Sequence, residues 1–411
     1  MSKEEQRKVP VLRFKGFTDD WEQRKLKDEY QKISNAFVGT ASPFYVEHGH
    51  FYLESNNIKN GQINHDHEVF INDTFYNEQR NKHLHTNDLV MVQSGHVGDS
   101  AVITKRYNNI AAHALIMFQN PKYSETSRFL NYYFQSYNAK KKISVISIGN
   151  TISHILASDM NKFITSFPKS SEQQKIATIF QRIQDLISLQ QQKLSLIEKL
   201  RENISEHIFS PDIMKFKNID PEFEIKKLSD ISNIFIGLVT TMTKNYAKNG
   251  ILLIRNSNIK ENNFKFDNYI YLDSKFAEKN KNREMKIGDV VTVHTGDIGT
   301  SAVIEPKEEN SIGFATITTR PNNKIINSYY LSDYLNTKKH KNWAVRMSTG
   351  DGRRNYNLKD FTRIRLNVPS LNYQIKIVAL IKYLESFSKS EKKKINQLNS
   401  LKQFLLQNLF I

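Results

Sequence analysis

The chain has 411 residues, of which 39% are hydrophobic and 25% charged, as in folded proteins of two or more domains. The absence of cysteine excludes disulfides, thiolate nucleophiles and cysteine zinc sites, and no apolar run approaches the ~20 residues that cross a membrane. The 59 Lys and Arg residues outnumber the 42 Asp and Glu residues, and the net charge of +17 favours a polyanionic partner such as nucleic acid. In chain order, the first residues, MSKEEQRKVP, are charged without an apolar stretch, so we expect no signal peptide and a cytoplasmic location.

Residues 1–168 are predicted to form a first globular domain with its N-terminal segment, because short β-branched and aromatic runs alternate with glycine and asparagine turns. Within this domain, QSGHVGDSAVI at 93–103 follows the apolar run NDLVMVQ. It has neither the P-loop pattern nor the dinucleotide-binding pattern of glycines. We therefore predict a strand, a tight turn and a strand, with Gly95 and Gly98 supplying backbone freedom at the turn.

Residues 169–210 are predicted to form a long helix, since they contain no glycine or proline and their apolar residues recur every seven positions. The main set recurs from Ile176, and a second apolar set, three residues later in the same seven-residue repeat, is Ile179, Leu186 and Leu200. A polar connector is expected at 211–222.

The second half of the chain repeats the first. A shift of 201 residues places the glycine turn on HTGDIGTSAVI at 294–304, and ESNNIKNGQI at 54–63 on RNSNIKENNF at 255–264. We therefore expect a second globular domain over 223–369 and a second long helix over 370–411.

The two long helices are expected to pair with each other, because an apolar stripe must be covered. The second apolar set of the second helix is Leu380, Phe387 and Leu401. The predicted pairing positions are Ile176, Ile183, Gln190, Ile197 and Ile204 in the first helix and Ile377, Leu384, Glu391, Leu398 and Leu405 in the second.

An antiparallel pair makes the molecule pseudo-twofold and sets Gln190 near Glu391, with Lys193 and Lys394 one step along. Such a polar layer costs stability but fixes the register. Packing of each helix on its own domain, or a parallel pair, remains open. A helix of ~39 residues is about 58 Å long, and we expect the pair to hold two DNA-binding domains one to two turns of duplex apart.

Three motifs carry a resemblance to a known family. Pro168 with SEQQKIATIF at 171–180 is similar to a P-x-x-x-E-Q-x-x-I helix start, WEQRKL at 21–26 to a W-E-x-x-K-L beginning, and GDVVTVHTGDIG at 288–299 to a strand with a glycine turn. The chain resembles, over its whole length, the specificity (S) subunit of type I restriction-modification systems. Asn87 replaces the leading glycine and Tyr373 the glutamate of the helix start, but the order of parts agrees in both copies.

The resemblance implies an α/β (α+β) fold with two similar target-recognition domains joined by an antiparallel pair of long coiled-coil helices. It also implies recognition of a bipartite, asymmetric double-stranded DNA target, one half-site per domain, in host defence. Two methyltransferase (modification) subunits that methylate adenine, and two restriction/translocase subunits, are the implied protein partners. S-adenosylmethionine, ATP and Mg²⁺ would bind those partners, so no cofactor, catalysis or membrane is expected for this chain.

The residues agree with a chain that has no methyltransferase site, because the N/D-P-P-Y/F motif of adenine methyltransferases is absent and the chain has no Pro-Pro pair. A nuclease-like pattern does occur, Pro211-Asp212 followed by Glu224-Ile225-Lys226, but it falls in the connector and is not repeated. The histidine pairs His48/His50, His65/His67 and His83/His85 have metal-ligand spacing but no counterparts in the second copy, so we expect histidines that face solvent or DNA.

The candidate DNA-contacting residues are polar or basic residues at the glycine turns and in basic clusters, and they differ between the copies. We expect about half of them to contact DNA, since lysine runs also occur on solvated surfaces. They are Arg80, Lys82, Ser94, His96, Lys140, Lys141, Lys142, Asn150, Lys281, Arg283, His294, Thr295, Asp297, Lys338, Lys339, Lys341, Arg353, Arg354 and Asn355. Arg353, Arg354 and Asn355 are the strongest base-contact candidates, and a stand-alone DNA-binding protein or a coiled-coil scaffold is the alternative function.

Overall fold

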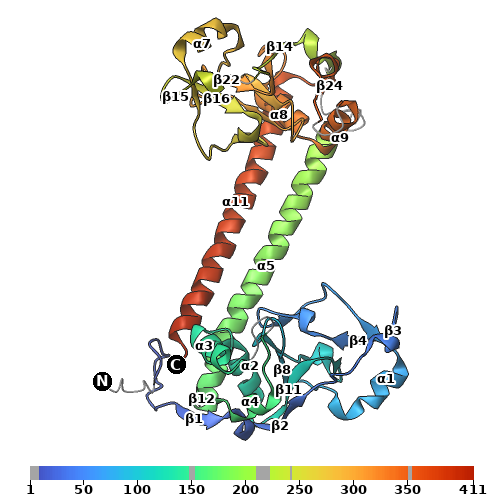
Figure 1. Cartoon of the computed structure of the whole chain (residues 1–411), viewed down its shortest axis with the longest axis vertical. Helices are drawn as coiled ribbons and strands as arrows, with labels where there is room; N and C mark the ends of the chain where they lie inside the picture. The colour runs from blue at the N-terminus through green and yellow to red at the C-terminus, as the bar shows by residue number, and fades with distance from the viewer. Residues whose placement is uncertain (1–8, 148–152, 210–222, 241–242, 350–353) are drawn as a thin grey trace. The chain divides into compact units, whose positions relative to one another are not determined.

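A computed structural model describes residues 9–147, 153–209, 223–240, 243–349 and 354–411 (Figure 1). The chain forms two compact units: unit 1 comprises residues 1–191 and 393–411, and unit 2 comprises residues 192–392. These units cut across the boundaries expected from the sequence, because each long helix contributes one part to each unit. The expected connector at 211–222 lies outside the described residues.

Unit 1 and unit 2 repeat the same elements in the same order. Those that begin in unit 1 are β1 (Glu22–Lys25), β2 (Tyr30–Asn35), β3 (Tyr45–Val46), β4 (His50–Leu53), β5 (Ile58–Lys59), β6 (Gln62–Ile63), β7 (Phe70–Ile71), α1 (Asp73–Glu78), β8 (Leu89–Val92), β9 (Ser100–Val102), β10 (Ala111–Ala112), β11 (Leu115–Pro121), α2 (Ser124–Tyr133), α3 (Tyr137–Ile146), α4 (Ala157–Lys162), β12 (Ile164–Phe167) and α5 (Ser170–Ile208).

Those that begin in unit 2 are β13 (Glu224–Lys227), β14 (Ser232–Ile236), β15 (Tyr246–Ala247), β16 (Ile251–Arg255), β17 (Ile259–Lys260), β18 (Asn263–Phe264), β19 (Tyr271–Leu272), α7 (Ser274–Lys279), β20 (Val290–Val293), β21 (Ser301–Val303), β22 (Ile312–Phe314), β23 (Thr316–Pro321), α8 (Ser328–Leu335), α9 (Lys338–Met347), α10 (Leu358–Phe361), β24 (Arg365–Val368) and α11 (Leu371–Asn408). No described helix is long and apolar enough to span a membrane.

Each unit contains two four-stranded sheets. The main sheet has the order β2-β11-β8-β9 in unit 1 and β14-β23-β20-β21 in unit 2, with antiparallel neighbours. The register repeats as well, since Val90 pairs with Ala101 and Val291 with Ala302. The smaller sheets, β10-β4-β7-β3 and β22-β16-β19-β15, each contain one parallel pair, β10 with β4 and β22 with β16.

Strand β8 shows why the apolar runs form the centre of the main sheet. All four of its residues are buried, and successive side chains point to opposite faces. Leu89 and Met91 join the core beneath helices α2 and α4, whereas Val90 and Val92 join the core on the other face of the sheet. A strand covered on both faces is continuously apolar, as NDLVMVQ is.

The glycine turns are confirmed in both units. Gly95 and Gly98 have φ of 83° and 91°, and Gly296 and Gly299 have φ of 101° and 87°, a region that favours glycine. The backbone N–H of the second glycine donates across each turn, to Val92 O and Val293 O at 3.1 Å.

A buried glutamine explains the start of each long helix. The Gln173 side chain donates to Pro168 O at 2.9 Å, and the Gln374 side chain donates to Pro369 O at 2.7 Å. Both glutamines are almost fully buried, so they are part of the helix-to-domain packing. The residue before each glutamine differs between the units. It is Glu172, which forms an ion pair with Arg13, in unit 1 and Tyr373 in unit 2.

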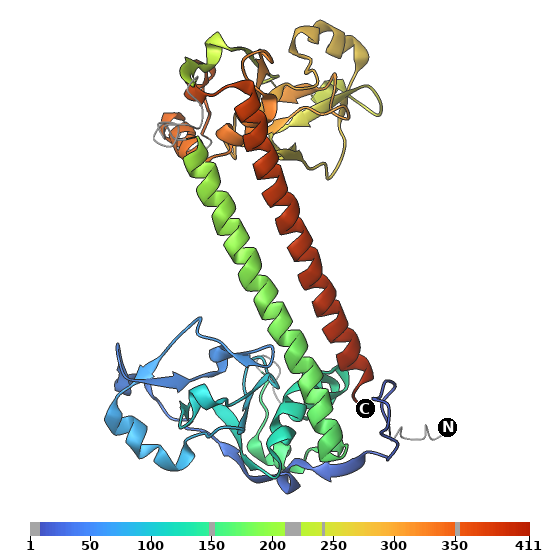
Figure 2. The same ribbon diagram turned by 180° about the vertical axis from the view of Figure 1, so that it is seen from behind.

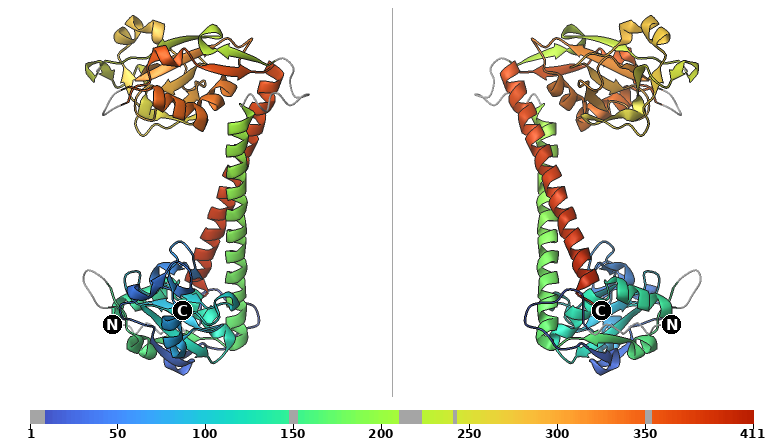
Figure 3. Two further views of the ribbon diagram at one scale, coloured as in Figure 1. Left: turned by 90° about the vertical axis from the view of Figure 1, so that its right-hand side faces the viewer. Right: turned by 90° about the vertical axis from the view of Figure 1, so that its left-hand side faces the viewer.

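Helices α5 and α11 lie side by side and run antiparallel within each unit (Figures 1 and 3). In unit 2, Lys193 Nζ lies 3.2 Å from Glu391 Oε1, and further along α5 Arg201 Nη1 lies 3.4 Å from Glu385 Oε1. In unit 1, Lys402 Nζ donates to Gln184 Oε1 at 2.9 Å.

Each of the predicted pairing positions is buried or half-buried. In the second set of positions, Phe387 faces α5, where Lys193 Nζ lies 4.8 Å from the centre of its ring, and Ile179 is half-buried, but the four leucines are exposed. Leu186, Leu200, Leu380 and Leu401 are 40–50% exposed, and the seam between the helices instead takes the residues that follow them by one place, among them Ile187, Ile381 and the buried Lys402. Burial follows the face toward the partner helix, and polar residues accept that position where a partner such as Gln184 is available.

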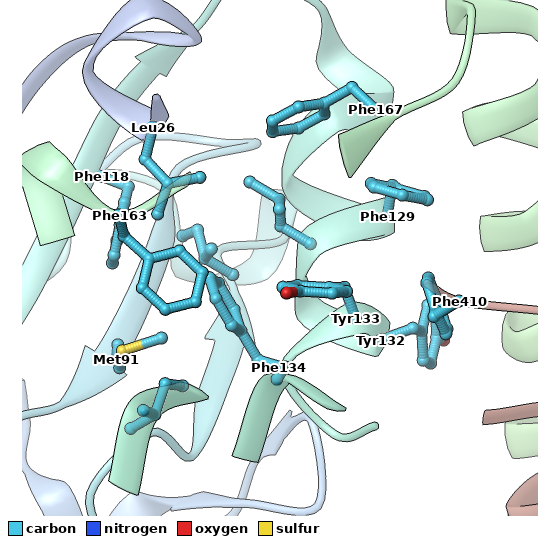
Figure 4. Close-up of a cluster of buried hydrophobic side chains, with 14 of the residues drawn as sticks. Leu26, Met91, Phe118, Phe129, Tyr132, Tyr133, Phe134, Phe163, Phe167 and Phe410 are labelled. Carbon is cyan, nitrogen blue, oxygen red and sulfur yellow. The ribbon is translucent and has the colours of Figure 1, made fainter. Parts of the chain in front are cut away.

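The end of α11 completes the core of unit 1. Phe410 is 2% exposed, and its ring lies 5.5–5.8 Å from the rings of Phe129, Tyr133 and Phe180 (Figure 4). The N-terminal segment also lies beside this end, where Leu12 N donates to Asn408 O at 2.9 Å (Figure 2). The equivalent residue in unit 2 is Phe209 at the end of α5, which packs against Tyr330 and Tyr334.

Candidate nucleic-acid interface

In unit 1, the glycine turn is held by the segment that precedes α4. Gly95 N donates to Ser153 O at 3.2 Å, and Ile155 N donates to Gln93 O at 2.9 Å. These bonds extend the strand pairing into a region with no regular sheet, so two loops far apart in sequence form one surface.

A third segment, the short turn after β4, completes this surface. His96 Nε2 lies 3.1 Å from Ser55 O in that turn. Beside it is a shallow pocket lined by Asn56, Ile58, Lys59, Asp66, His67, His96 and Asp99.

Unit 2 builds the same surface with different side chains. Asn256, in the turn after β16, donates from Nδ2 to Thr295 O at 2.6 Å. The Thr295 hydroxyl donates to Asn355 Oδ1 at 2.7 Å, and Tyr356 N donates to His294 O at 2.9 Å. The scaffold of three loops is therefore shared, although its side chains are not.

The exposed side chains of the glycine turns differ in charge between the units. His96 and Asp297 occupy the same position, both exposed, and Asp297 accepts a hydrogen bond from Thr300 at 2.9 Å. Ser94 and His294 are half-buried. Burial lowers the pKa of His294, which favours a neutral imidazole at neutral pH.

Two of the three strongest base-contact candidates are described by the structure. Arg354 is exposed, whereas Arg353, like Asn150, lies outside the described residues. Asn355 pairs with Thr349 through two backbone hydrogen bonds, which close the loop. Because the Asn355 carbonyl oxygen already accepts from Thr295, the side chain braces the turn and is not placed for the two-atom contact by which asparagine recognises adenine.

Two equivalent basic clusters, at 80–82 and 281–283, each contain one cation bound within the fold and one that is exposed. Lys82 Nζ lies 3.4 Å from Ala36 O, and Arg283 Nη1 donates to Gly237 O at 2.5 Å, which is the equivalent carbonyl in unit 2. These two cations hold the loop after the first strand of the main sheet. Their neighbours are exposed, with Lys281 paired to Glu278 at 3.1 Å and Arg80 facing solvent.

The lysines around α9 in unit 2 are compensated by carboxylates. Lys338 forms an ion pair with Glu202 of α5, and Lys341 Nζ lies 2.7 Å from Glu261. Lys339 is exposed.

The three lysines of α3 in unit 1 differ from those of α9. Lys140, Lys141 and Lys142 are exposed, and none of them forms an ion pair with a residue that the structure describes. Among the described residues, unit 1 therefore presents a cationic patch without ion pairs where unit 2 has paired charges.

A family model for the type I restriction modification DNA specificity domain matches residues 18–199 and 221–400, each of which contains one copy of the three-loop surface. The chain belongs to this family. The first specificity domain is the globular part of unit 1, and the second is that of unit 2.

Two curated relatives are specificity subunits. The type I restriction enzyme EcoBI specificity subunit of Escherichia coli is 25% identical over 167 residues, which are 40% of this chain and 35% of the relative. The MjaIX specificity subunit of Methanocaldococcus jannaschii is 28% identical over 141 residues, which are 31% of this chain and 32% of the relative. The match thus spans about a third of the length of each relative.

Solved structures share the fold over nearly the whole chain. The S subunit of a type I restriction-modification system from M. genitalium superposes with a TM-score of 0.59 at 16% identity, covering 98% of this chain and 99% of that one. The HsdS subunit from Thermoanaerobacter tengcongensis gives 0.53 at 14% identity, covering 94% and 95%. The fold of two similar domains with two long helices is therefore that of these subunits.

The first part of the nuclease-like pattern, Pro211 and Asp212, lies outside the described residues. Glu224 and Lys226 are described, and they form an ion pair with each other on β13. Among the described residues, no three His, Asp or Glu side chains gather in a way that could hold a metal ion.

The histidine pairs of the first specificity domain separate into different contacts. His50 lies 2.8 Å from Asp73 and stacks on Tyr76, and His65 lies 2.7 Å from the Tyr107 hydroxyl. His83 is buried, and this burial lowers its pKa. Their partners in sequence, His48, His67 and His85, are exposed.

The prediction of site residues missed the turn after β4 and β16. Its central asparagine is buried in both domains and accepts from the backbone three residues earlier, Asn57 from Glu54 N and Asn258 from Arg255 N. The signal was present in the repeated ESNNIK and RNSNIK, where an asparagine in a non-apolar stretch recurs at the same place.

Proposed function

We propose that this chain is the DNA specificity subunit of a type I restriction-modification complex. Each specificity domain recognises one half of a bipartite, asymmetric target in double-stranded DNA, and the chain itself catalyses no step. S-adenosylmethionine, ATP and Mg²⁺ are bound by the partner subunits, in a cytoplasmic assembly. The observation that carries the proposal is the three-loop surface, which repeats in backbone and differs in side chains, as two half-sites of different sequence require.

The helices supply the surface for the partner subunits in this proposal. Besides the seam, α5 exposes Leu186, Leu189, Leu196 and Leu200 to 47–67%, and α11 exposes Tyr383 and Phe404 to 63% and 54%. Large apolar side chains that recur on the outer face of a helix pair are typical of helix-to-helix association with another protein. We assign this face to the two methyltransferase subunits, with the two restriction/translocase subunits joining that core.

The proposal is tested by co-expressing the chain with its methyltransferase and mapping methylated adenines across a host genome by single-molecule sequencing. The expected result is a split motif, two short defined halves around a fixed gap. A soluble, stably assembled complex that adds no methylation would overturn the proposal and favour a DNA-binding protein or scaffold that modifies nothing.

The docking surface has its own test. We expect the pair L196D/L200D to abolish co-purification of methyltransferase, because charged residues replace apolar contact area of the kind that commonly contributes about 2–4 kcal/mol per central residue. The matched control E198Q lies on the same helix turn and is expected to retain the partner. Retention of the partner by both variants, with unchanged melting temperature, would remove this face from the docking surface.

A further inference from the structure

One position beside the three-loop surface has opposite charge in the two domains. Glu54 ends the extended segment after β4, and Arg255 is the last residue of β16, at the equivalent place. Both donate their backbone N–H to the asparagine of the following turn, at 3.0 and 2.9 Å. The backbone is thus the same, and only the side chain changes.

In the first domain, the Glu54 carboxylate is used within the protein. It accepts from the Tyr45 hydroxyl at 2.8 Å and lies 3.2 Å from His113 Nδ1, whose other ring nitrogen lies 3.0 Å from Gly39 O. The hydrogen bond with His113 lowers the pKa of Glu54, and the same contact raises the pKa of His113. Glu54 therefore braces the smaller sheet through its Oε1 atom.

In the second domain, Tyr246 keeps the place of Tyr45, but the histidine partner of this position is gone. Phe314 stands where the first domain has His113, and pairs with Arg255 across the β16–β22 ladder. The Arg255 guanidinium has no hydrogen bond or ion pair with any residue in the described part of the chain, and its Nε is buried without an acceptor. A buried donor without an acceptor is costly, so the free donors of Arg255 favour binding of an acceptor from outside the chain.

Two other arginines of the second domain do have hydrogen-bond partners within the protein. Arg320 binds both oxygens of Asp289 at 2.9 and 2.7 Å, and Arg283 donates to two backbone carbonyls. Both are fixed within the fold, whereas Arg255 is half-buried with its donors unused.

Arg255 is also adjacent to the surface proposed to meet DNA. The next residue, Asn256, donates to Thr295 O in the glycine turn. On the other side of the turn, His294 N donates to Ala315 O, one residue after Phe314. The residues that follow Arg255 and its ladder partner Phe314 are therefore both bonded to the glycine turn.

We propose, on the basis of the proposed function, that Arg255 is a DNA contact of the second specificity domain with no counterpart in the first. Its ligand is a pair of acceptor oxygens or nitrogens, the chemistry that guanine presents through O6 and N7 and that the backbone presents through phosphate oxygens. The change from Glu54 to Arg255 then gives the two domains different half-site contacts on the same scaffold.

The experiment compares R255Q, R255K and the matched control E54Q in complex with methyltransferase, with adenine methylation mapped and rates measured on duplexes. R255Q is expected to keep the first half-site, the gap and the melting temperature, and to lose roughly tenfold to a hundredfold in methylation at the second half-site. Relaxation at a single base pair identifies guanine as the ligand, whereas a uniform loss with a weaker salt dependence identifies phosphate. E54Q is expected to lower the stability of the first domain without relaxing the second half-site.

Unchanged methylation by R255Q would overturn the assignment, as would a lowered melting temperature with equal loss at both half-sites, which indicates a structural arginine. If R255Q does not fold, R255K retains the charge and stem and is judged by the same outcomes. A wild-type complex that methylates no split motif is instead a failure of the proposed function. In that case the full chains of wild type and R255Q are compared for binding of duplex DNA, and equal affinity would overturn the Arg255 contact.

Discussion

The smaller sheets of the two specificity domains have the same backbone and different interiors. In the first, Tyr52, His113, Phe75 and Tyr76 form a cluster of rings and hydrogen bonds. In the second, the equivalent sheet is filled by aliphatic residues such as Leu253, Leu272 and Ile312. Strand pairing is nevertheless equivalent, with β4 parallel to β10 and β16 parallel to β22. Backbone register is thus maintained by the strands and turns, and the side chains on them are free to diverge.

The largest expected effect is a loss of stability. It tests whether the phenylalanine at the end of a long helix completes the core of each unit in the same way, Phe410 after α11 in unit 1 and Phe209 after α5 in unit 2. Phe410→Ala is expected to destabilise unit 1 by about 3–5 kcal/mol, because it removes a ring packed among three others. Phe209→Ala is expected to act equally on unit 2. Hydrogen exchange, followed by mass spectrometry, locates the loss of protection. Loosening of the opposite unit by either variant would contradict the equivalence.

An intermediate effect is expected on the salt dependence of DNA binding, which compares the lysines of α3 with those of α9. K140A/K141A/K142A is expected to reduce the salt dependence of DNA binding by the complex by about two to three ion equivalents, since each phosphate contact contributes about 0.9. K338A/K341A is expected to change it by less than one, because both lysines already pair with carboxylates. Binding of a labelled duplex is measured at several salt concentrations. Equal changes for the two variants would show that the ion pairs do not distinguish the patches.

The smallest effect concerns pH. Glu54 raises the pKa of His113, so this contact stabilises the first domain fully below pH 6.5 and is lost as pH rises through the raised pKa. His113→Phe, which copies Phe314, is expected to remove about 1–2 kcal/mol of stability at pH 6 and less at pH 8. Chemical denaturation at both pH values measures the difference between variant and wild type. A difference that does not depend on pH would show that His113 is neutral in the folded protein.

Much of the fold followed from the sequence because repeats and turns are local patterns. Gly95 and Gly98 were placed in a turn, and the departure at Asn87 is explained by its φ of 74°, since asparagine tolerates the conformation that Gly288 adopts at 85°. At Leu186 the sequence indicated the exposed residue and not the buried Ile187, because the two neighbours are equally apolar. Only the position of the partner helix decides between them.

Candidate DNA-contacting residues were harder to predict from the sequence, because charge alone does not show whether a cation already has a partner within the protein. Lys82 and Arg283 bind backbone carbonyls, and Lys338 and Lys341 bind carboxylates, from positions far away in the chain. Arg255 was not predicted as a site residue because nothing in the sequence shows that its side chain has no partner within the described part of the protein. It is a single arginine in a repeated turn, and its lack of a partner is visible only in three dimensions.

The contribution of residues 393–411 to unit 1 has a consequence for biosynthesis. The first specificity domain leaves the ribosome early, yet part of its interior is translated about two hundred residues later. Until then Phe129, Tyr133 and Phe180 lack the ring that covers them, and the domain waits with an exposed apolar surface. Contacts of such long sequence separation form slowly. A ribosome that stalls in the second half therefore leaves a nascent chain that is a chaperone substrate, although its first domain is fully synthesised up to the start of α5.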